Sequence, residues 1–290
     1  MFEGVLTALV TPFRDGAIDQ QKLRDLVDLQ VAGGVDGLVP CGTTGESATL
    51  SYAEHRQVIE IVVEAAAGRV AVVAGTGSNN TREAIEFTVH AREAGADGAL
   101  LISPYYNKPT QQGIVEHFAA IAREAAFPLI PYNVPSRTSS NILPDTVVQL
   151  AEIEHVVGIK EACGDIGQIG DVIARVPADF AVLSGDDSMT LPLLALGGRG
   201  VISVTSNVAP ALMAELVHLF QSGNVAGARA VHQRLLPLSD ALFCETNPIP
   251  VKAALEIMGR IGPEIRLPLT PLGEGNRERL QVVMKEVGIL

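Results

Sequence analysis

A single lysine interrupts a short apolar stretch that otherwise has the character of a buried strand. The run VVGIKEACG at residues 156–164 places Lys160 among valine, isoleucine and glycine. A free lysine has a pKa near 10.4, so it is almost wholly protonated near neutral pH and is a poor nucleophile. Burial in an apolar pocket disfavours the cation and lowers the pKa by roughly three units. One interpretation of this position is therefore an amine that attacks a carbonyl group and forms an imine.

The alternative interpretation is a lysine held by a buried ion pair. Glu161 is a poor partner, because neighbouring residues of a strand point to opposite faces. Asp186 and Asp187 follow the next predicted strand and remain candidates. Structural ion pairs also perturb the pKa of lysine, so position alone leaves both interpretations open.

Hydroxyl, phenol and guanidinium groups follow other predicted strands. The motif GTTGES offers backbone N–H groups and the hydroxyls of Thr43 and Thr44 to a small carboxylate, and we expect Glu46 or Ser47 to cap the next helix. The motifs SPYYNKP and PYNVPSRTS hold three of the four tyrosines and one arginine. Phenols relay protons, and an arginine binds a carboxylate through two hydrogen bonds.

The sequence lacks the residues that several other chemistries need. No GxSxG turn is present, GTGSNN lacks the third glycine of a dinucleotide-binding fingerprint, and no two histidines have the spacing of a helical metal site. The glycines of GGRGVIS precede a predicted strand, which favours close packing over phosphate binding. The three cysteines form no CxxC pair, which argues against a disulfide framework and a zinc site. We expect no metal and no cofactor.

The elements that position these residues alternate along the chain. Eight short β-rich runs are each followed by a stretch with helical periodicity, which is typical of a parallel sheet. No glycine fingerprint follows the first strand, so a closed (β/α)8 TIM barrel is favoured over an open sheet, and its strand ends meet at one mouth. We expect strands within residues 5–13, 34–42, 69–77, 96–106, 128–135, 156–162, 180–187 and 200–207.

After the eighth strand the periodicity is helical only. Stretches at residues 226–243, 247–259 and 276–288 predict a C-terminal helical appendage. We therefore divide the chain into a (β/α)8 catalytic barrel over residues 1–223 and a three-helix extension over residues 224–290.

Charge and hydropathy exclude two classes of partner. The formal net charge is −12, and the basic residues are scattered, so we expect no binding to nucleic acid. The segment MFEGVLTALVTPF resembles neither a signal peptide nor a membrane span. We expect a cytoplasmic protein that does not bind membranes.

Seven motifs together resemble one known family. GTTGESATL, SPYYNKP, YNVPSRT, GIKEA, LSGDD, GVISVTSN and NPIPVK are similar to the dihydrodipicolinate synthase group of the pyruvate-dependent class I aldolase and lyase superfamily, over nearly the whole chain. The resemblance implies a lyase that condenses pyruvate with L-aspartate 4-semialdehyde to 4-hydroxy-tetrahydrodipicolinate, on the route to diaminopimelate and lysine, without a cofactor. It also implies a homotetramer built as a dimer of dimers.

The resemblance implies a role for each matching residue. Lys160 forms the imine with pyruvate, and Tyr132 acts as general acid and base. Tyr132 is linked through Thr43 to Tyr106, which reaches in from a neighbouring subunit. The implied substrate-binding residues are Thr44 for the pyruvate carboxylate, Arg137 for the semialdehyde carboxylate, and Gly185 and Ile202 through their backbone groups.

A regulatory lysine site is also implied. Some members of the family are inhibited by lysine at a dimer interface, and the matching residues are Ser47, Ala48, His55, Asn79, Glu83 and Tyr105. Tyr52 stands where lysine-sensitive members often have histidine. Polar residues of this kind also cap helices, so lysine inhibition stays a hypothesis.

Two other functions stay open. An aldolase for N-acetylneuraminate or a 2-keto-3-deoxy sugar acid belongs to the same superfamily, but Arg137 suits a short second substrate that ends in a carboxylate, whereas a polyol chain needs neutral hydroxyl partners. The other alternative is a metabolite-binding barrel that has lost catalysis and serves as a scaffold or sensor. The complete set of Lys160, Tyr132, Thr43 and Tyr106 argues against it.

Overall fold

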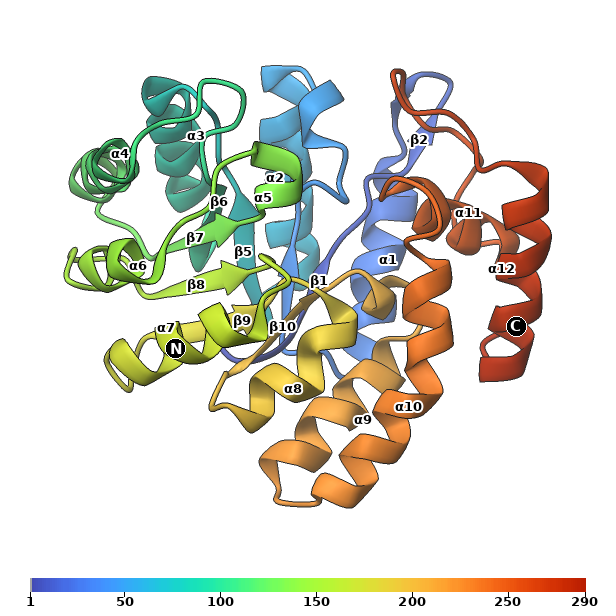
Figure 1. Ribbon diagram of the computed structural model, residues 1–290. Coiled ribbons are helices and arrows are strands. Elements are labelled where there is room, and N and C mark those ends of the chain that lie inside the picture. The colour runs from blue at the N-terminus through green and yellow to red at the C-terminus, as the bar shows by residue number, and fades with distance from the viewer. Residues whose placement is uncertain (1) are drawn as a thin grey trace.

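Eight parallel strands close into a barrel in the computed structural model, which describes residues 2–290 (Figure 1). Neighbouring strands follow chain order round the barrel, and β1 closes the circle by pairing with both β4 and β10. The predicted (β/α)8 fold is confirmed. The barrel strands lie within the expected ranges or one residue outside them: β1 (Gly4–Ala8), β4 (Gly37–Val39), β5 (Ala71–Gly75), β6 (Gly98–Ile102), β7 (Leu129–Asn133), β8 (Gly158–Glu161), β9 (Ala181–Ser184) and β10 (Gly200–Ser203). A short antiparallel pair, β2 (Phe13–Arg14) and β3 (Ala17–Ile18), follows β1.

Helices cover the outside of the barrel (Figure 1). Several of these helices begin directly after a residue whose side chain accepts a hydrogen bond from a free backbone N–H group of the first turn. Asp19 does so for α1 and Thr110 for α4. The helices that follow the strands are α1 (Gln20–Ala32), α2 (Tyr52–Ala66), α3 (Thr81–Glu93), α4 (Gln111–Ala125), α5 (Pro135–Thr138), α6 (Pro144–Ala151), α7 (Ile166–Arg175), α8 (Thr190–Ala195) and α9 (Pro210–Gln221).

The start of α2 corrects one expectation. Neither Glu46 nor Ser47 caps this helix, because the chain first makes a short turn over Ser47–Thr49. Ser51 caps it instead, and Glu54 accepts in return from the backbone N–H of Ser51. This reciprocal pair is a capping box, which satisfies two free donors at once.

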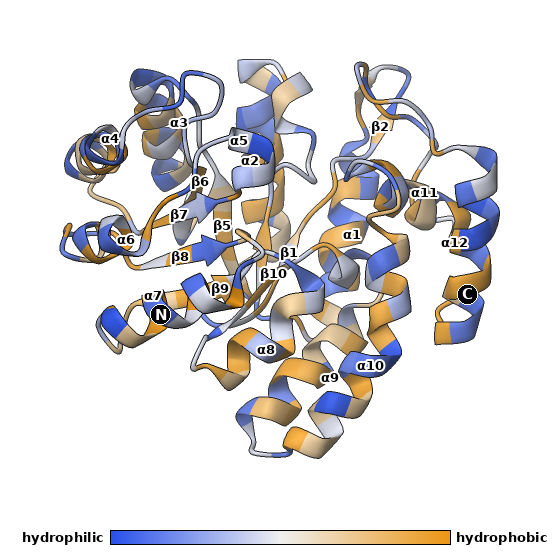
Figure 2. Cartoon of the chain, in the orientation of Figure 1, coloured by the Kyte–Doolittle hydropathy of each residue, from blue (hydrophilic) through white to orange (hydrophobic). Residues whose placement is uncertain are grey.

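The barrel strands separate two apolar layers. Leu100 points into the barrel, whereas Leu101 packs against the surrounding helices, as the alternation of strand side chains requires. On β8 the outward residue is Ile159, so Lys160 belongs to the inward series. Figure 2 shows the end of β8 in blue, in contrast to the largely hydrophobic strands around it.

Three further helices follow the barrel, as the predicted C-terminal appendage requires: α10 (Val225–Ala241), α11 (Ile249–Ile257) and α12 (Glu274–Val287). Helix α10 packs against α9 and α12, and α11 also contacts α12, so the orange and red helices line one side of the molecule (Figure 1). The division into residues 1–223 and 224–290 stays a prediction. None of the helices within residues 2–290 combines the length and the apolar character that a bilayer crossing needs.

Candidate active site

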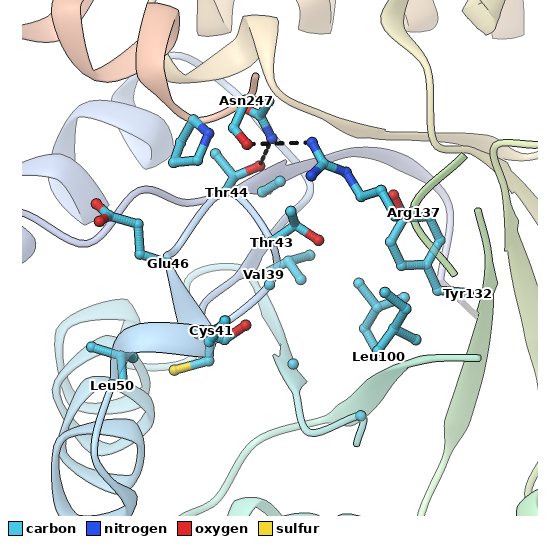
Figure 3. Close-up of a pocket in the computed structure, with 18 of the residues that line it drawn as sticks. Val39, Cys41, Thr43, Thr44, Glu46, Leu50, Leu100, Tyr132, Arg137 and Asn247 are labelled. Atoms are coloured by element: carbon cyan, nitrogen blue, oxygen red, sulfur yellow. Dashed lines mark hydrogen bonds between the residues drawn. The ribbon is translucent and has the colours of Figure 1, made fainter. Parts of the chain in front are cut away.

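A cavity of about 680 Å³ lies at the carboxyl ends of the barrel strands. Residues that end or follow β4, β7, β8 and β9 line it, together with the segment between α10 and α11 (Figure 3). The barrel therefore gathers at one mouth side chains that the sequence separates widely. Six of the eight predicted catalytic and substrate-binding residues belong to the lining: Thr43, Thr44, Tyr132, Arg137, Lys160 and Gly185.

Lys160 lies at the bottom of this mouth and is only 5 % exposed. It is the register partner of Tyr132 on the neighbouring strand, and its Nζ lies 4.2 Å from the centre of the tyrosine ring. Burial lowers the pKa of Lys160 to about 7; the carboxylate of Asp187 opposes this shift and the guanidinium of Arg137 adds to it. A large fraction of this amine is therefore uncharged near neutral pH.

The neighbouring carboxylates are engaged elsewhere. The ion pairs that lysines form within residues 2–290 involve Lys22 and Lys252, not Lys160. Asp187 accepts hydrogen bonds from the hydroxyl of Ser203 and from two backbone N–H groups, each at 3.0 Å. Glu161 accepts from the side-chain amide of Asn133. The structure therefore favours the reactive amine over the ion pair.

Tyr132 is a buried phenol beside the amine. Burial raises its pKa to about 12, although the positive charge of Arg137 works in the opposite direction. The phenol therefore stays protonated at neutral pH and has a proton to donate. Figure 3 shows Arg137 and Tyr132 on one side of the cavity and Thr43 across from them.

The GTTGES segment forms a tight turn whose middle residues keep free donors. The N–H groups of Gly45 and Ser47 donate to the carbonyl of Gly42. No backbone carbonyl within residues 2–290 accepts from the N–H groups of Thr43 and Thr44. Thr44 is buried, and its hydroxyl oxygen accepts from the side-chain amide of Asn247 at 3.0 Å. The turn thus presents free N–H donors and a fixed hydroxyl to a ligand.

Gly185 makes room for the reactive lysine. A Cβ atom at this position would lie 2.9 Å from Cε of Lys160 and 2.8 Å from Cβ of Ala162, closer than atoms in real contacts approach. Ile202 lies on β10 with its side chain in the buried interior of the barrel, and it is not part of the cavity lining.

The two remaining site residues differ in their placement. Arg137 lies on the short helix α5, and its guanidinium donates to the backbone carbonyl of Asn247 at 3.3 Å (Figure 3). Tyr106 is 91 % exposed, has a positive φ of 71°, and lies outside the cavity lining. Within residues 2–290 it therefore does not join the other catalytic candidates.

The expected regulatory residues gather beside the same cavity. Glu83 accepts hydrogen bonds from the hydroxyls of Tyr52 and Ser78, one to each carboxylate oxygen. The side-chain amide of Asn79 donates to the backbone carbonyl of Tyr105 at 3.1 Å. The cavity lining includes Ser47, Ala48, His55, Glu83 and Tyr105, but not Asn79.

A second buried lysine escaped the sequence reasoning. Lys252 on α11 is only 5 % exposed and forms an ion pair with the fully buried carboxylate of Glu46. Glu46 also accepts from the backbone N–H of Arg266 at 3.0 Å. The motif NPIPVK contains Lys252, but a position near a helix start gave no sign of burial. Asn247 in the same motif was missed for the same reason.

The described residues offer no place for a metal ion. Within residues 2–290, no three His, Cys, Asp or Glu side chains lie close enough together to hold one. The cysteines are free thiols, and burial raises the pKa of Cys41 far above its ordinary value. The cavity lining presents the amine of Lys160, the phenol of Tyr132 and the hydroxyl groups of Thr43 and Thr44.

Comparisons with known proteins agree on one family. The model of the Dihydrodipicolinate synthetase family matches residues 1–287. A 4-hydroxy-tetrahydrodipicolinate synthase of Syntrophus aciditrophicus is 58 % identical over 290 residues, which is 100 % of both chains. The crystal structure of dihydrodipicolinate synthase from Aquifex aeolicus has a TM-score of 0.98 and 48 % identity, and the match covers 99 % of each chain. A chloride-inhibited synthase from Acinetobacter baumannii, crystallised with pyruvate, has a TM-score of 0.98 and 46 % identity over 100 % of each chain. The chain therefore belongs to the dihydrodipicolinate synthetase family.

Proposed function

We propose that this chain is a lyase that condenses pyruvate with L-aspartate 4-semialdehyde to 4-hydroxy-tetrahydrodipicolinate, in the biosynthesis of diaminopimelate and lysine. One observation supports this most strongly. The chain matches a 4-hydroxy-tetrahydrodipicolinate synthase over its full length at 58 % identity, and it places a desolvated amine at the mouth of its barrel. Such an amine is the group that Schiff-base chemistry needs.

The proposed reaction begins at Lys160. Its neutral amine attacks the carbonyl carbon of pyruvate, and water leaves as the imine forms. The protonated imine withdraws electrons, so the adjacent methyl group loses a proton and becomes an enamine carbon. That carbon attacks the aldehyde carbon of the second substrate, a carbon–carbon bond forms, and the aldehyde oxygen takes up a proton. The amino group of the second substrate then attacks the imine carbon, the ring closes, and Lys160 leaves as the free amine.

Tyr132 is proposed as the group that moves these protons. Its ring lies beside Nζ of Lys160, and its raised pKa keeps the phenol protonated until a base accepts its proton. Thr43 lines the same cavity and serves as the next hydroxyl of the relay. Tyr106 would complete the relay from a neighbouring subunit, since its own side chain is exposed.

Two separate groups are proposed to bind the two substrate carboxylates. Thr44, with its hydroxyl and free N–H group, binds the carboxylate of pyruvate. The family resemblance adds backbone groups of Gly185, which lines the cavity, and of Ile202, which does not. Arg137, at the cavity wall above Tyr132, binds the carboxylate of the semialdehyde. We further propose that the chain is cytoplasmic and forms a homotetramer.

Imine trapping tests the proposal. The protein is incubated with pyruvate, reduced with borohydride and digested, and the peptides are analysed by mass spectrometry. We expect one pyruvate-derived adduct on Lys160, and none in Lys160→Arg, whose guanidinium is not a nucleophile. An unmodified lysine at position 160 in the wild-type chain contradicts the proposal.

A product assay separates the proposal from the sugar-acid alternative. The enzyme is given pyruvate with L-aspartate 4-semialdehyde, and separately N-acetylneuraminate and 2-keto-3-deoxy sugar acids. We expect turnover of the semialdehyde, because Arg137 is paired only to a backbone carbonyl within residues 2–290 and has donors left for a carboxylate. Turnover of a sugar acid alone would reject it.

A further inference from the structure

Asn247 lies where two proposed substrate-binding residues meet. It belongs to the segment between α10 and α11, is 5 % exposed, and lines the cavity. Its side-chain Nδ2 donates to the hydroxyl oxygen of Thr44 at 3.0 Å, while its backbone carbonyl accepts from Arg137 at 3.3 Å (Figure 3). The side chain therefore contacts one site residue, and the backbone contacts the other.

The amide bond sets the direction in which Thr44 donates. A threonine hydroxyl has one hydrogen to donate and two lone pairs that accept. When Nδ2 of Asn247 occupies a lone pair, the hydroxyl hydrogen turns to the remaining directions. The free N–H groups of Thr43 and Thr44 belong to the same turn. A carboxylate bound there receives these N–H bonds and the oriented hydroxyl bond together.

The other end of the amide has no structural partner. The oxygen Oδ1 of Asn247 is buried and accepts no hydrogen bond within residues 2–290. A buried acceptor without a partner lowers stability, so a side chain chosen for packing alone would not be an amide. The amide at this position is thus explained by its bond to Thr44.

We infer that Asn247 is a positioning residue that orients the hydroxyl of Thr44 toward the carboxylate of pyruvate, an inference that rests on the proposed function. The C-terminal extension thereby supplies a part of the pyruvate site. Asn247 touches no reacting atom and acts through Thr44.

The side chain of Asn247 contacts Thr44 and its backbone contacts Arg137, so a substitution of the side chain tests the inference. Asn247→Ala removes the bond to Thr44 but keeps the carbonyl that anchors Arg137. We expect the pyruvate concentration for half-maximal imine trapping, and the KM for pyruvate, to rise about tenfold. The KM for the semialdehyde stays within about twofold. Arg137→Ala serves as the matched control, because it should raise the KM for the semialdehyde and leave the KM for pyruvate nearly unchanged.

A double-substitution cycle tests whether the effect runs through Thr44. Thr44→Val removes the hydroxyl, so adding Asn247→Ala to it causes no further rise in the KM for pyruvate. If the two effects multiply in the double variant, Asn247 acts independently of Thr44 and the inference is wrong. A parallel rise in both KM values of Asn247→Ala likewise overturns it, because that pattern indicates a general distortion of the mouth.

Asn247→Asp provides a second variant of almost identical shape. Its carboxylate accepts the hydrogen of the Thr44 hydroxyl and repels the carboxylate of pyruvate, so we expect a larger rise in the KM for pyruvate than Asn247→Ala causes. A smaller rise contradicts the inference. A wild-type chain that forms no imine overturns the proposed function and this inference together, whereas normal wild-type trapping with an unchanged KM in Asn247→Ala overturns the inference alone.

Discussion

Water reaches very little of the amine that we propose as the nucleophile. The side chain of Lys160 is enclosed by the barrel, and this burial is the main cause of its low pKa. The phenol of Tyr132 responds to the same burial in the opposite sense, because desolvation always favours the neutral form. One apolar environment therefore leaves a large fraction of the amine uncharged near neutral pH and keeps the neighbouring phenol protonated.

The pH dependence of imine formation follows from this pKa. The neutral amine is the reactive form, and burial lowers the pKa of Lys160 to about 7. We expect the rate of pyruvate imine formation to rise about tenfold per pH unit below pH 7 and to level off above it. Quenched-flow trapping from pH 5 to about 9.5 measures this profile. An ordinary lysine would give a rate that still rises steeply at pH 9.

Gly185→Ala is expected to displace the amine of Lys160 while leaving the lysine itself unchanged. The new Cβ atom would lie 2.9 Å from Cε of Lys160, so one of the two groups must move. We expect kcat to fall on the order of 100-fold, because a misplaced nucleophile loses its attack geometry. Steady-state kinetics measure the loss. Gly275→Ala, where no atom lies within 4 Å of the added Cβ, is the control and should retain wild-type kcat.

At the scale of elements, the loop after β4 depends on α11. The buried pair of Glu46 and Lys252 joins the GTTGES turn to this helix, and Nζ also donates to the carbonyl of Thr11 at 3.1 Å. Burial lowers the pKa of Lys252, although the carboxylate of Glu46 opposes the shift. The turn that we propose to bind substrate is therefore held from the C-terminal side of the chain.

Lys252→Met is expected to destabilise the fold. It leaves the carboxylate of Glu46 buried without its cation, which costs about 3–5 kcal/mol of unfolding free energy. The double variant Glu46→Gln with Lys252→Met removes both charges and should recover most of this loss. Urea unfolding followed by circular dichroism gives the comparison. Equal stability of the single and double variants would show that the buried charge is not the cause.

The hydrogen bond from Tyr52 on α2 to Glu83 on α3 leads to a prediction about lysine inhibition. Glu83 already accepts from the hydroxyls of Tyr52 and Ser78, one on each carboxylate oxygen, so the ammonium group of a bound lysine would share this carboxylate with both hydroxyls. Tyr52→Phe removes one competitor and should lower the lysine concentration for half-inhibition several-fold, by about the strength of one charged hydrogen bond. Activity titrations with lysine on both chains measure the difference. An equal response, or none in either chain, rejects the hypothesis.

At the scale of the whole molecule, a single chain leaves one proposed catalytic residue outside the site. Tyr106 is 91 % exposed and does not line the cavity. Under the proposed function this phenol acts in the site of a neighbouring subunit, so its role depends on the assembly of at least two chains.

Mixing two inactive variants tests this assembly. In a mixed dimer of Lys160→Ala and Tyr106→Phe, one site receives both defects and the other receives an intact lysine and an intact tyrosine. We therefore expect activity to reappear after the two proteins are denatured and refolded together, up to about one quarter of wild-type activity for random pairing. Each variant refolded alone is the control. If sedimentation shows that the mixture is oligomeric and activity still does not recover, the relay lies within one chain.

Much of this molecule was predictable from local patterns. The alternation of β-rich and helical stretches gave the eight strands, because side chains on strands and helices repeat with different periods. The same period places Lys160 on the inward face of β8, one residue after the outward Ile159. Parallel strands all end at one mouth, so the residues after them were expected to meet there.

The partners of the C-terminal residues depended on tertiary structure alone. Asn247 bonds to Thr44 across 203 residues, and Lys252 pairs with Glu46 across 206. A hydrophobic period tells whether a side chain is buried within its own element, but not which distant segment covers it. Those contacts exist only because the helices after the barrel pack back onto its mouth. The sequence by itself therefore determined the barrel and the inward position of Lys160, and the fold decided which side chains hold the turn of Thr43 and Thr44 in place.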